Sequence, residues 1–315
     1  MRYMIGVVTA TILLATLAVV THAHTAGPSF PTIEPITDRD CEIMAQNYTW
    51  QPDNPVACKR LRAILFSYSS DEMLKTDGKI VVLDLIAPEV AKLMHDLSER
   101  GFYIKKSRPL EEYKGDDIAS MNDNNTSAFN GRRTVTSSGW SLHAYGVAID
   151  LNPLQNPVIY PNQQEDPLGS IAHGMVVPGK PGTALIRPAA SSNANNNYLN
   201  RNIYRARPDE DGFYRRGMAE SVADLFAYYG FLTWGGYWND PLDYQHFEVG
   251  PRSFVERLYA MDSPASTNPI NGRVRFIQYV DTYRRCLDAN RHNASDASQV
   301  RAYCARETIA QFSME

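Results

Sequence analysis

The 315-residue sequence lacks an excess of charge of either sign, since 31 basic side chains against 35 acidic ones give a formal net charge of −4. This near balance gives no support to nucleic acid or an anionic membrane surface as the main partner. Internal repeats and long low-complexity tracts are also lacking, which excludes collagen, coiled coil and disorder as the dominant state. A hydrophobic share of 43% and a charged share of 21% are ordinary for a globular protein with a core.

A hydrophobic run long enough to span a membrane is lacking as well. The uncharged apolar run Ile5–Val20 is shorter than the roughly 20 residues that a spanning helix needs. Arg2 precedes this run, and Thr21 and Ala23 place small residues where signal peptidase requires them. We therefore expect residues 1–23 to be a signal peptide and the mature protein to be periplasmic or secreted, without stable membrane insertion. An uncleaved N-terminal anchor is the alternative.

Cysteine is scarce, and its spacing argues against a metal site with sulfur ligands. The four cysteines form two couples whose members lie much farther apart than the roughly two to four residues of zinc-binding couples. An even number of cysteines in an exported chain indicates disulfides. We expect Cys41–Cys58 and Cys286–Cys304 to staple the two ends of the chain, although four cysteines allow three pairings.

Hydrophobic periodicity predicts strands and helices without a regular alternation. The β-branched run Lys79–Asp84 predicts a strand, and Glu89–Arg100 has apolar residues at helical spacing. A further strand is expected to start at Gly101–Ile104, and another to span Val147–Leu151. A helix is expected over Arg216–Tyr229. This order favours an α+β fold over a doubly wound parallel sheet.

The chain divides into a central domain with an extension at each end. Thr25–Thr37 is rich in proline and threonine and is typical of a linker, so residues 24–58 are expected to form an N-terminal linker and extension. Residues 59–255 are expected to form the main domain. Residues 256–315 are expected to form a helical C-terminal appendage, in which Arg273–Leu287 is amphipathic.

A long stretch rich in proline, glycine and asparagine, Pro153–Gly212, interrupts the main domain. A segment of this length inside a compact domain is usually a lid, a binding loop or disordered. The sequence does not decide among these three.

The segment Ser141–Asn152 carries the first candidate residues of a functional site. His143 precedes a turn that contains Gly146, and Asp150 lies in the strand beyond it. This order of elements can return the carboxylate toward the imidazole, which supplies one nitrogen and one oxygen ligand to a metal. Taken alone, His143 is more often a hydrogen-bonded turn residue and Asp150 a strand-end cap.

The segment Trp234–Glu248 carries the second group. His246 would complete a His/Asp/His set that leaves a fourth position for water, as catalytic zinc sites do. Asp243 would then be free to act as general base on that water. The alternatives are a turn residue at Asp243 and a half-buried strand residue at His246. A serine hydrolase built on Ser141 is disfavoured, since no Gly-x-Ser-x-Gly elbow is present.

Together the two segments resemble a known family. The pattern Ser-x-His-x-x-Gly-x-Ala-x-Asp-x-Asn, followed by Trp-Gly-Gly and Asp-x-x-His-Phe, resembles the D-alanyl-D-alanine carboxypeptidase family of zinc peptidases (VanY-type). That family includes L-alanyl-D-glutamate endopeptidases and shares its fold with hedgehog signalling domains. The resemblance extends from about Leu61 to Val255. It implies a hedgehog/DD-peptidase-like antiparallel sheet flanked by helices, one Zn²⁺, and a zinc peptidase domain over residues 59–255.

The resemblance also implies roles for individual residues. The family's zinc ligands fall on His143, Asp150 and His246, and its catalytic carboxylate falls on Asp243, where some branches have Glu. Its upstream arginine, which holds the scissile carbonyl or a substrate carboxylate, matches Arg132. Arg133 and Arg108 are the alternatives to Arg132. Further expected site residues are Trp234, Tyr237, Trp238 and Tyr145 lining the cleft, and Ser141 and Asn152 supporting the ligands.

The function that this resemblance implies is hydrolysis of peptide bonds in peptidoglycan stem peptides. A D-alanyl-D-alanine carboxypeptidase is favoured, and it needs a positive group for the free carboxylate of its substrate. The long segment offers Lys180, Arg187, Arg201, Arg205 and Arg207 for this purpose. An L-alanyl-D-glutamate endopeptidase, which needs an open groove, is the first alternative. A catalytically inactive wall-binding protein is the second, although such a protein could dispense with Asp243.

Overall fold

The computed structural model describes residues 29–71, 73–134, 139–160, 185–187, 213–239, 241–262, 271–291 and 297–314. The expected signal peptide and most of the long segment after Pro153 lie outside these residues. The helices and 3-10 turns are α1 (Asp38–Gln46), η1 (Cys58–Arg60), α2 (Ala87–Glu99), η2 (Leu110–Tyr113), α3 (Asp117–Asn122), η3 (Leu142–Tyr145), η6 (Ala219–Ser221), α5 (Ala223–Tyr228), η7 (Gly235–Tyr237), α6 (Arg252–Met261), α7 (Gly272–Asn290) and α8 (Ala297–Ser313). The strands are β1 (Thr32–Pro35), β2 (Leu61–Ser70), β3 (Met73–Leu83), β4 (Lys106–Ser107), β5 (Asn125–Thr126), β6 (Ala148–Asp150), β7 (Val158–Tyr160), β8 (Leu185–Arg187), β9 (Thr233–Trp234), β10 (Leu242–Asp243) and β11 (His246–Glu248).

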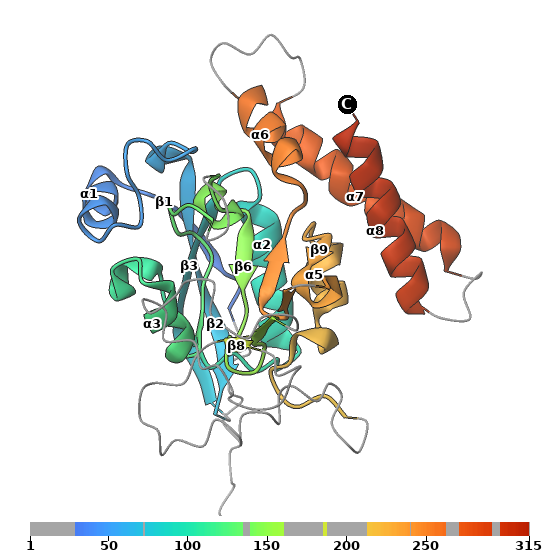
Figure 1. The fold of residues 1–315 in the computed structure, drawn as a ribbon, viewed down its shortest axis with the longest axis horizontal. Coiled ribbons are helices and arrows are strands. Elements are labelled where there is room, and N and C mark those ends of the chain that lie inside the picture. The colour runs from blue at the N-terminus through green and yellow to red at the C-terminus, as the bar shows by residue number, and fades with distance from the viewer. Residues whose placement is uncertain are drawn as a thin grey trace, which may run out of the picture.

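Small antiparallel sheets and surrounding helices make this an α+β protein, as the sequence predicts. The described strands form the sheets β1-β2-β3, β10-β7-β8 and β6-β11-β9, together with the parallel pair β4-β5. Helix α2 packs against β2 (Figure 1). Its apolar residues Val90, Leu93, Met94 and Leu97 are fully buried. The predicted helix is therefore confirmed, with a start at Ala87. None of the described helices is long and apolar enough to cross a membrane.

The sheet β6-β11-β9 is joined to the larger sheet through loop backbone. The Leu83 amide at the end of β3 donates to the Gly146 carbonyl, and the Phe129 amide donates to the Val81 carbonyl. Ser127 forms a further bridge to Asp150, so β6 has pairing partners along both of its edges. These hydrogen bonds hold β6 and the turn before it against the core of the protein.

Three local predictions need correction. Thr32–Pro35, predicted as linker, forms the edge strand β1, where prolines are tolerated because the outer edge needs no amide donors. The strand predicted at Gly101–Ile104 is reduced to a single bridge at Tyr103, and regular pairing begins only with β4. The helix predicted from Arg216 begins at Ala223, because Gly217 adopts φ +83° and breaks the helical backbone.

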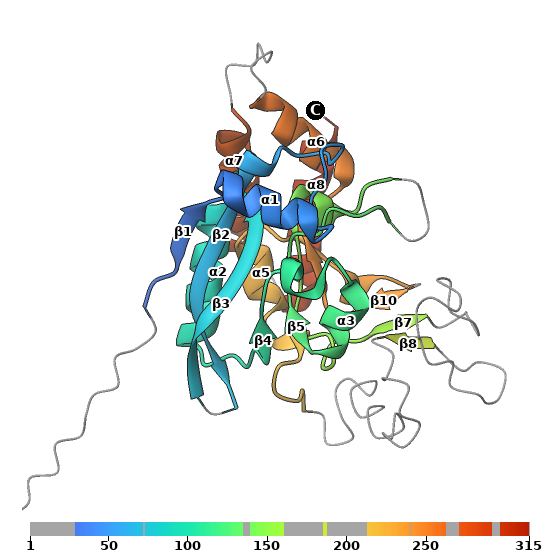
Figure 2. The ribbon, with the colours of Figure 1, turned by 90° about the vertical axis from the view of Figure 1, so that its left-hand side faces the viewer.

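The two predicted disulfides are both present. Cys41–Cys58 joins α1 to η1, and Cys286–Cys304 joins α7 to α8. Figure 2 shows the helices α6, α7 and α8 gathered at one end of the molecule. The Tyr279 hydroxyl of α7 donates to the Val249 carbonyl at 2.7 Å, which ties these helices to the end of β11. The C-terminal helices thus contribute to the same hydrophobic core as the sheets.

Replacing Gly146 with alanine is expected to lower the free energy of unfolding by about 2 kcal/mol or more. Gly146 has φ +69°, and an added Cβ would lie 2.7 Å from the Leu83 amide nitrogen. Gly101→Ala is the matched control, because Gly101 has φ +61° but no heavy atom within 4 Å of its added Cβ. Urea unfolding followed by circular dichroism measures both variants. Equal losses would contradict a role for the contact with β3.

Candidate metal centre

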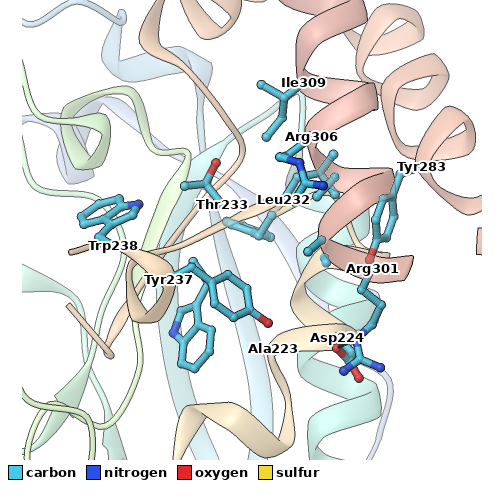
Figure 3. A pocket seen from close by; sticks show the side chains of 15 residues that line it. Ala223, Asp224, Leu232, Thr233, Tyr237, Trp238, Tyr283, Arg301, Arg306 and Ile309 are labelled. Atoms are coloured by element: carbon cyan, nitrogen blue, oxygen red, sulfur yellow. Dashed lines mark ion pairs between the residues drawn. The ribbon is translucent and has the colours of Figure 1, made fainter. Parts of the chain in front are cut away.

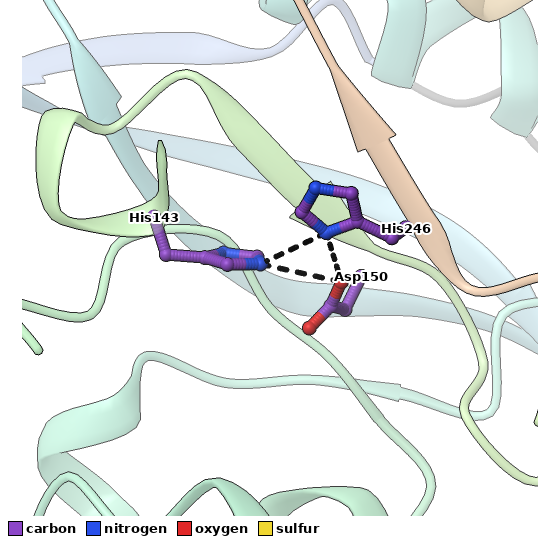
Figure 4. Close-up of side chains that lie close together, drawn as sticks. All are labelled: His143, Asp150 and His246. Carbon is purple, nitrogen blue, oxygen red and sulfur yellow. Dashed lines mark hydrogen bonds and ion pairs between the residues drawn. The ribbon is translucent and has the colours of Figure 1, made fainter. Parts of the chain in front are cut away.

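Three potential ligands meet at one point of the sheet β6-β11-β9. His143 comes from η3, Asp150 ends β6, and His246 begins β11 directly opposite Asp150 in the strand register. His143 Nε2 lies 3.2 Å from His246 Nδ1 and 3.3 Å from Asp150 Oδ1, and His246 Nδ1 lies 3.1 Å from the same oxygen (Figure 4). We call these three residues the ligand triangle. The sequence prediction that they lie together is met by the structure.

The local sequence explains how His143 reaches this position. The Ser141 hydroxyl accepts from the His143 amide at 3.3 Å and caps the 3-10 turn. Gly146 ends the turn in the left-handed conformation, which returns the chain into β6. Asp150 then follows on the strand, with its carboxylate turned back toward the imidazole.

The outer nitrogen of each imidazole donates to a fixed acceptor. His143 Nδ1 lies 2.5 Å from the Ala128 carbonyl oxygen, and His246 Nε2 lies 3.0 Å from Glu248 Oε2. A carbonyl and a carboxylate can only accept, so both outer nitrogens carry hydrogen. The inner nitrogens therefore offer lone pairs to the space between the three side chains. Lone pairs this close repel one another unless a cation, either a proton or a metal ion, lies between them.

Electrostatics inside the triangle also favours a cation. Burial alone would raise the pKa of the Asp150 carboxyl, but the charges and hydrogen bonds of His143 and His246 hold that pKa far below its ordinary value. Burial disfavours a charged imidazole, yet hydrogen bonds to Asp150 and Glu248 raise the pKa of His246 well above its ordinary value. A metal ion would replace the proton that these residues otherwise hold.

The triangle fits zinc in its dimensions and its donor types. Ligands about 2.0–2.1 Å from a tetrahedral zinc ion lie about 3.3 Å from one another. The edges of the triangle measure 3.1–3.3 Å, and the three donor atoms are two imidazole nitrogens and one carboxylate oxygen. Two nitrogens and one oxygen with a fourth position left for water are typical of catalytic zinc.

Asp243 supplies a carboxylate oxygen that no group among the described residues satisfies. It lies on β10, opposite Val158 of β7, and its buried Oδ1 has no hydrogen-bond partner among the described residues. Burial raises the pKa of Asp243 to about 7, and the charge of Asp150 adds to this effect, whereas the charge of His246 opposes it. Gly235 of the Trp-Gly-Gly segment allows the close approach, because its added Cβ would lie 2.9 Å from the Asp243 Cβ. A carboxylate oxygen that is buried beside the triangle without a hydrogen-bond partner is suited to accept a proton from water.

Among the three candidate arginines, Arg132 is the one whose charge affects the pKa of Asp243. Its positive charge lowers the pKa of that carboxyl, and its guanidinium is held by an ion pair with Asp117. Arg133 instead lies over the Trp140 ring, 3.7 Å from its centroid. Arg108 forms an ion pair with Asp77 on the larger sheet. Arg133 and Arg108 are thus engaged with other residues, whereas the positive charge of Arg132 acts on Asp243.

The predicted aromatic residues lie in different surroundings. Trp238 contacts the His246 ring, with centroids 5.4 Å apart, whereas the buried Trp234 stacks on Phe247. Trp234, Tyr237 and Trp238 also line a pocket of about 300 Å³ between α5, η7 and α8 (Figure 3). The Tyr145 hydroxyl donates to Glu256 of α6 at 2.7 Å, so its polar end is directed to the C-terminal helices.

The polar residues predicted to support the ligands act through the backbone. Ser141 binds the His143 amide, as described above. The Asn152 side-chain amide donates to the Tyr103 carbonyl at 2.6 Å and to the Gly217 carbonyl at 3.2 Å, which anchors the end of β6. Of the basic residues considered for a substrate carboxylate, only the backbone of Arg187 lies within the described residues.

The groups that contact the two imidazoles and the Arg132 guanidinium were not predicted from the sequence. These are the Ala128 carbonyl, Glu248 and Asp117. The Glu248 contact could have been predicted, because residues two apart on a strand share a face and Glu248 follows His246 by two. The Ala128 and Asp117 contacts could not have been predicted, since they join segments that are separate along the chain.

Residues 134–249 match the family model described as D-alanyl-D-alanine carboxypeptidase. The resemblance predicted from the two motifs is confirmed over this range, which contains the ligand triangle and Asp243. No curated protein and no solved structure matches the chain.

Proposed function

Because residues 134–249 match that family of zinc peptidases, we propose that the protein is an exported zinc peptidase that removes the terminal D-alanine from peptidoglycan stem peptides. The observation that carries this proposal is the ligand triangle with the unsatisfied Asp243 beside it. A structural metal site would not need a carboxylate oxygen that is buried without a hydrogen-bond partner, since such burial costs stability.

The chemistry proposed for the site is hydrolysis of a peptide bond. A zinc ion held by His143, Asp150 and His246 supplies Lewis-acid activation of water and of the scissile carbonyl. Asp243 accepts the proton of the attacking water at Oδ1 and passes it to the nitrogen of the leaving amine. The Arg132 guanidinium donates to the carbonyl oxygen as negative charge develops there. Trp238, beside His246, shields this side of the site from bulk water.

The same proposal extends to the organisation of the chain. We assign residues 1–23 to a signal peptide, 24–58 to an N-terminal extension, 59–255 to a peptidase domain of the hedgehog/DD-peptidase fold, and 256–315 to a C-terminal appendage. The two disulfides support export, because disulfides persist in oxidising compartments. Peptidoglycan lies in the same compartment, which makes its stem peptides accessible to the mature protein.

Mass spectrometry of purified pentapeptide muropeptides tests this function. Incubation with the zinc-loaded mature protein is expected to remove one alanine mass from the C-terminal end of the stem peptide. The Asp243→Ala variant, treated identically, is expected to leave the muropeptides intact.

Two other outcomes would overturn the proposed bond specificity or the proposed reaction. Cleavage that leaves a single L-alanine on the sugar would identify an L-alanyl-D-glutamate endopeptidase. Absence of any product from folded, zinc-loaded wild-type protein would contradict hydrolysis and favour a wall-binding role.

A further inference from the structure

Glu248 lies on the outer side of the ligand triangle and contacts one of its imidazoles. It follows His246 by two residues on β11, so both side chains project from the same face of the strand. Glu248 Oε2 lies 3.0 Å from His246 Nε2, and the two side chains are only 16% and 12% exposed. The contact is therefore a charge-assisted hydrogen bond in a largely water-excluded position.

The Glu248 carboxylate has a single partner among the described residues. Within the described part of the chain, His246 is its only hydrogen-bond or ion-pair partner. A mostly buried carboxylate with a single partner contributes little to stability, because its loss of hydration offsets the attraction. The residue at this position is thus better explained by its effect on His246 than by its contribution to folding.

The two imidazoles are held by acceptors of different strength. His143 Nδ1 donates to the neutral Ala128 carbonyl, whereas His246 Nε2 donates to a charged carboxylate. A carboxylate acceptor makes the opposite ring nitrogen a stronger electron donor to a metal than a carbonyl acceptor does. His246 is accordingly the more basic of the two nitrogen ligands.

Glu248 itself is not placed to bind the ion or to act on water. It contacts Nε2, whereas Nδ1 on the opposite side of the ring faces His143 and Asp150. The imidazole therefore separates the Glu248 carboxylate from the other two ligands. Glu248 can influence the metal only through His246.

We propose that Glu248 is the positioning residue that holds His246 with hydrogen on Nε2 and so makes Nδ1 its metal-binding atom, thereby setting the zinc affinity of the site. This inference rests on the proposed function in one respect, namely that the triangle binds zinc. It assigns Nε2 of His143 and Nδ1 of His246 as the ligating nitrogens.

Zinc affinity, measured by competition with a chromophoric chelator, tests the proposal. Glu248→Ala is expected to raise the zinc dissociation constant about 10–100-fold, the usual range for loss of such a partner. Glu248→Gln keeps an acceptor oxygen without the charge and is expected to show a smaller increase. Glu256→Gln is the matched control, because Glu256 accepts from the Tyr145 hydroxyl outside the triangle. Its zinc affinity is expected to equal that of the wild type.

Long-range ¹⁵N–¹H correlation spectra of the zinc-loaded wild type give a second readout that does not depend on a variant that folds. The expected spectrum shows hydrogen on Nε2 of His246 and metal on Nδ1. The reverse arrangement, or wild-type affinity in Glu248→Ala, would overturn the proposal. A wild-type protein that binds no zinc would overturn both this inference and the proposed function. Zinc bound through Nδ1 without muropeptide cleavage would contradict the function alone.

Discussion

Replacing Asp150 with alanine is expected to abolish both zinc binding and peptide hydrolysis. The Asp150 carboxylate is the only negatively charged member of the ligand triangle and lies 3.1 Å from His246 Nδ1 and 3.3 Å from His143 Nε2. Its loss leaves two neutral imidazoles, which hold a divalent ion much more weakly. The zinc dissociation constant should rise more than about 100-fold, beyond the effect of losing an outer hydrogen-bond partner.

Chelator competition measures the loss of zinc affinity, and a muropeptide assay on the same samples measures the loss of hydrolysis. Asp150→Asn is the companion variant, since it keeps the size of the side chain and removes only the charge. Asp96→Asn is the control, because Asp96 accepts from the Tyr229 hydroxyl at 2.7 Å on α2, outside the triangle. Zinc binding at wild-type strength in Asp150→Ala would show that the triangle is not the metal site.

Replacing Asp243 with asparagine is expected to lower kcat/KM by about 10²–10⁴-fold, the usual contribution of a general base. Zinc affinity is expected to stay close to that of the wild type, because Asp243 is not a member of the triangle. The isosteric amide fills the same space and removes a desolvated carboxylate, so the variant should fold. Steady-state kinetics on a synthetic stem pentapeptide, with zinc content determined in parallel, separates these two effects.

The pH profile gives an independent check of the Asp243 assignment. Burial raises the pKa of Asp243 to about 7, and a general base must be ionised to accept a proton. In the wild type, kcat/KM should therefore rise with pH until the carboxyl has lost its proton. A zinc ion nearby stabilises the ionised form and shifts this rise in kcat/KM to below pH 7. The rise should be missing in Asp243→Asn, and its persistence would assign the base to another group.

Much of the local structure could be predicted from the sequence, because it depends on neighbouring residues. The spacing of apolar residues in α2 predicts a helix wherever the helix lies, and the end of strand β3 follows from the β-branched run Lys79–Asp84. The pairings Cys41–Cys58 and Cys286–Cys304 could be predicted because each couple is close along the chain. Predictions failed where the local structure depends on pairing between segments that are distant along the chain. The strand β1 exists only because β2 offers it an open edge.

The sequence by itself determined the chemical types at the site: two imidazoles, a ligating carboxylate, a second carboxylate and an arginine, in an order that resembles one peptidase family. Tertiary structure alone decided how these groups meet. The antiparallel register of β6 and β11 places Asp150 opposite His246, although 96 residues separate them along the chain. That register also turns Nδ1 of His246 inward and leaves Nε2 to Glu248. Such choices depend on backbone hydrogen bonds between distant segments, which no local pattern of side chains encodes.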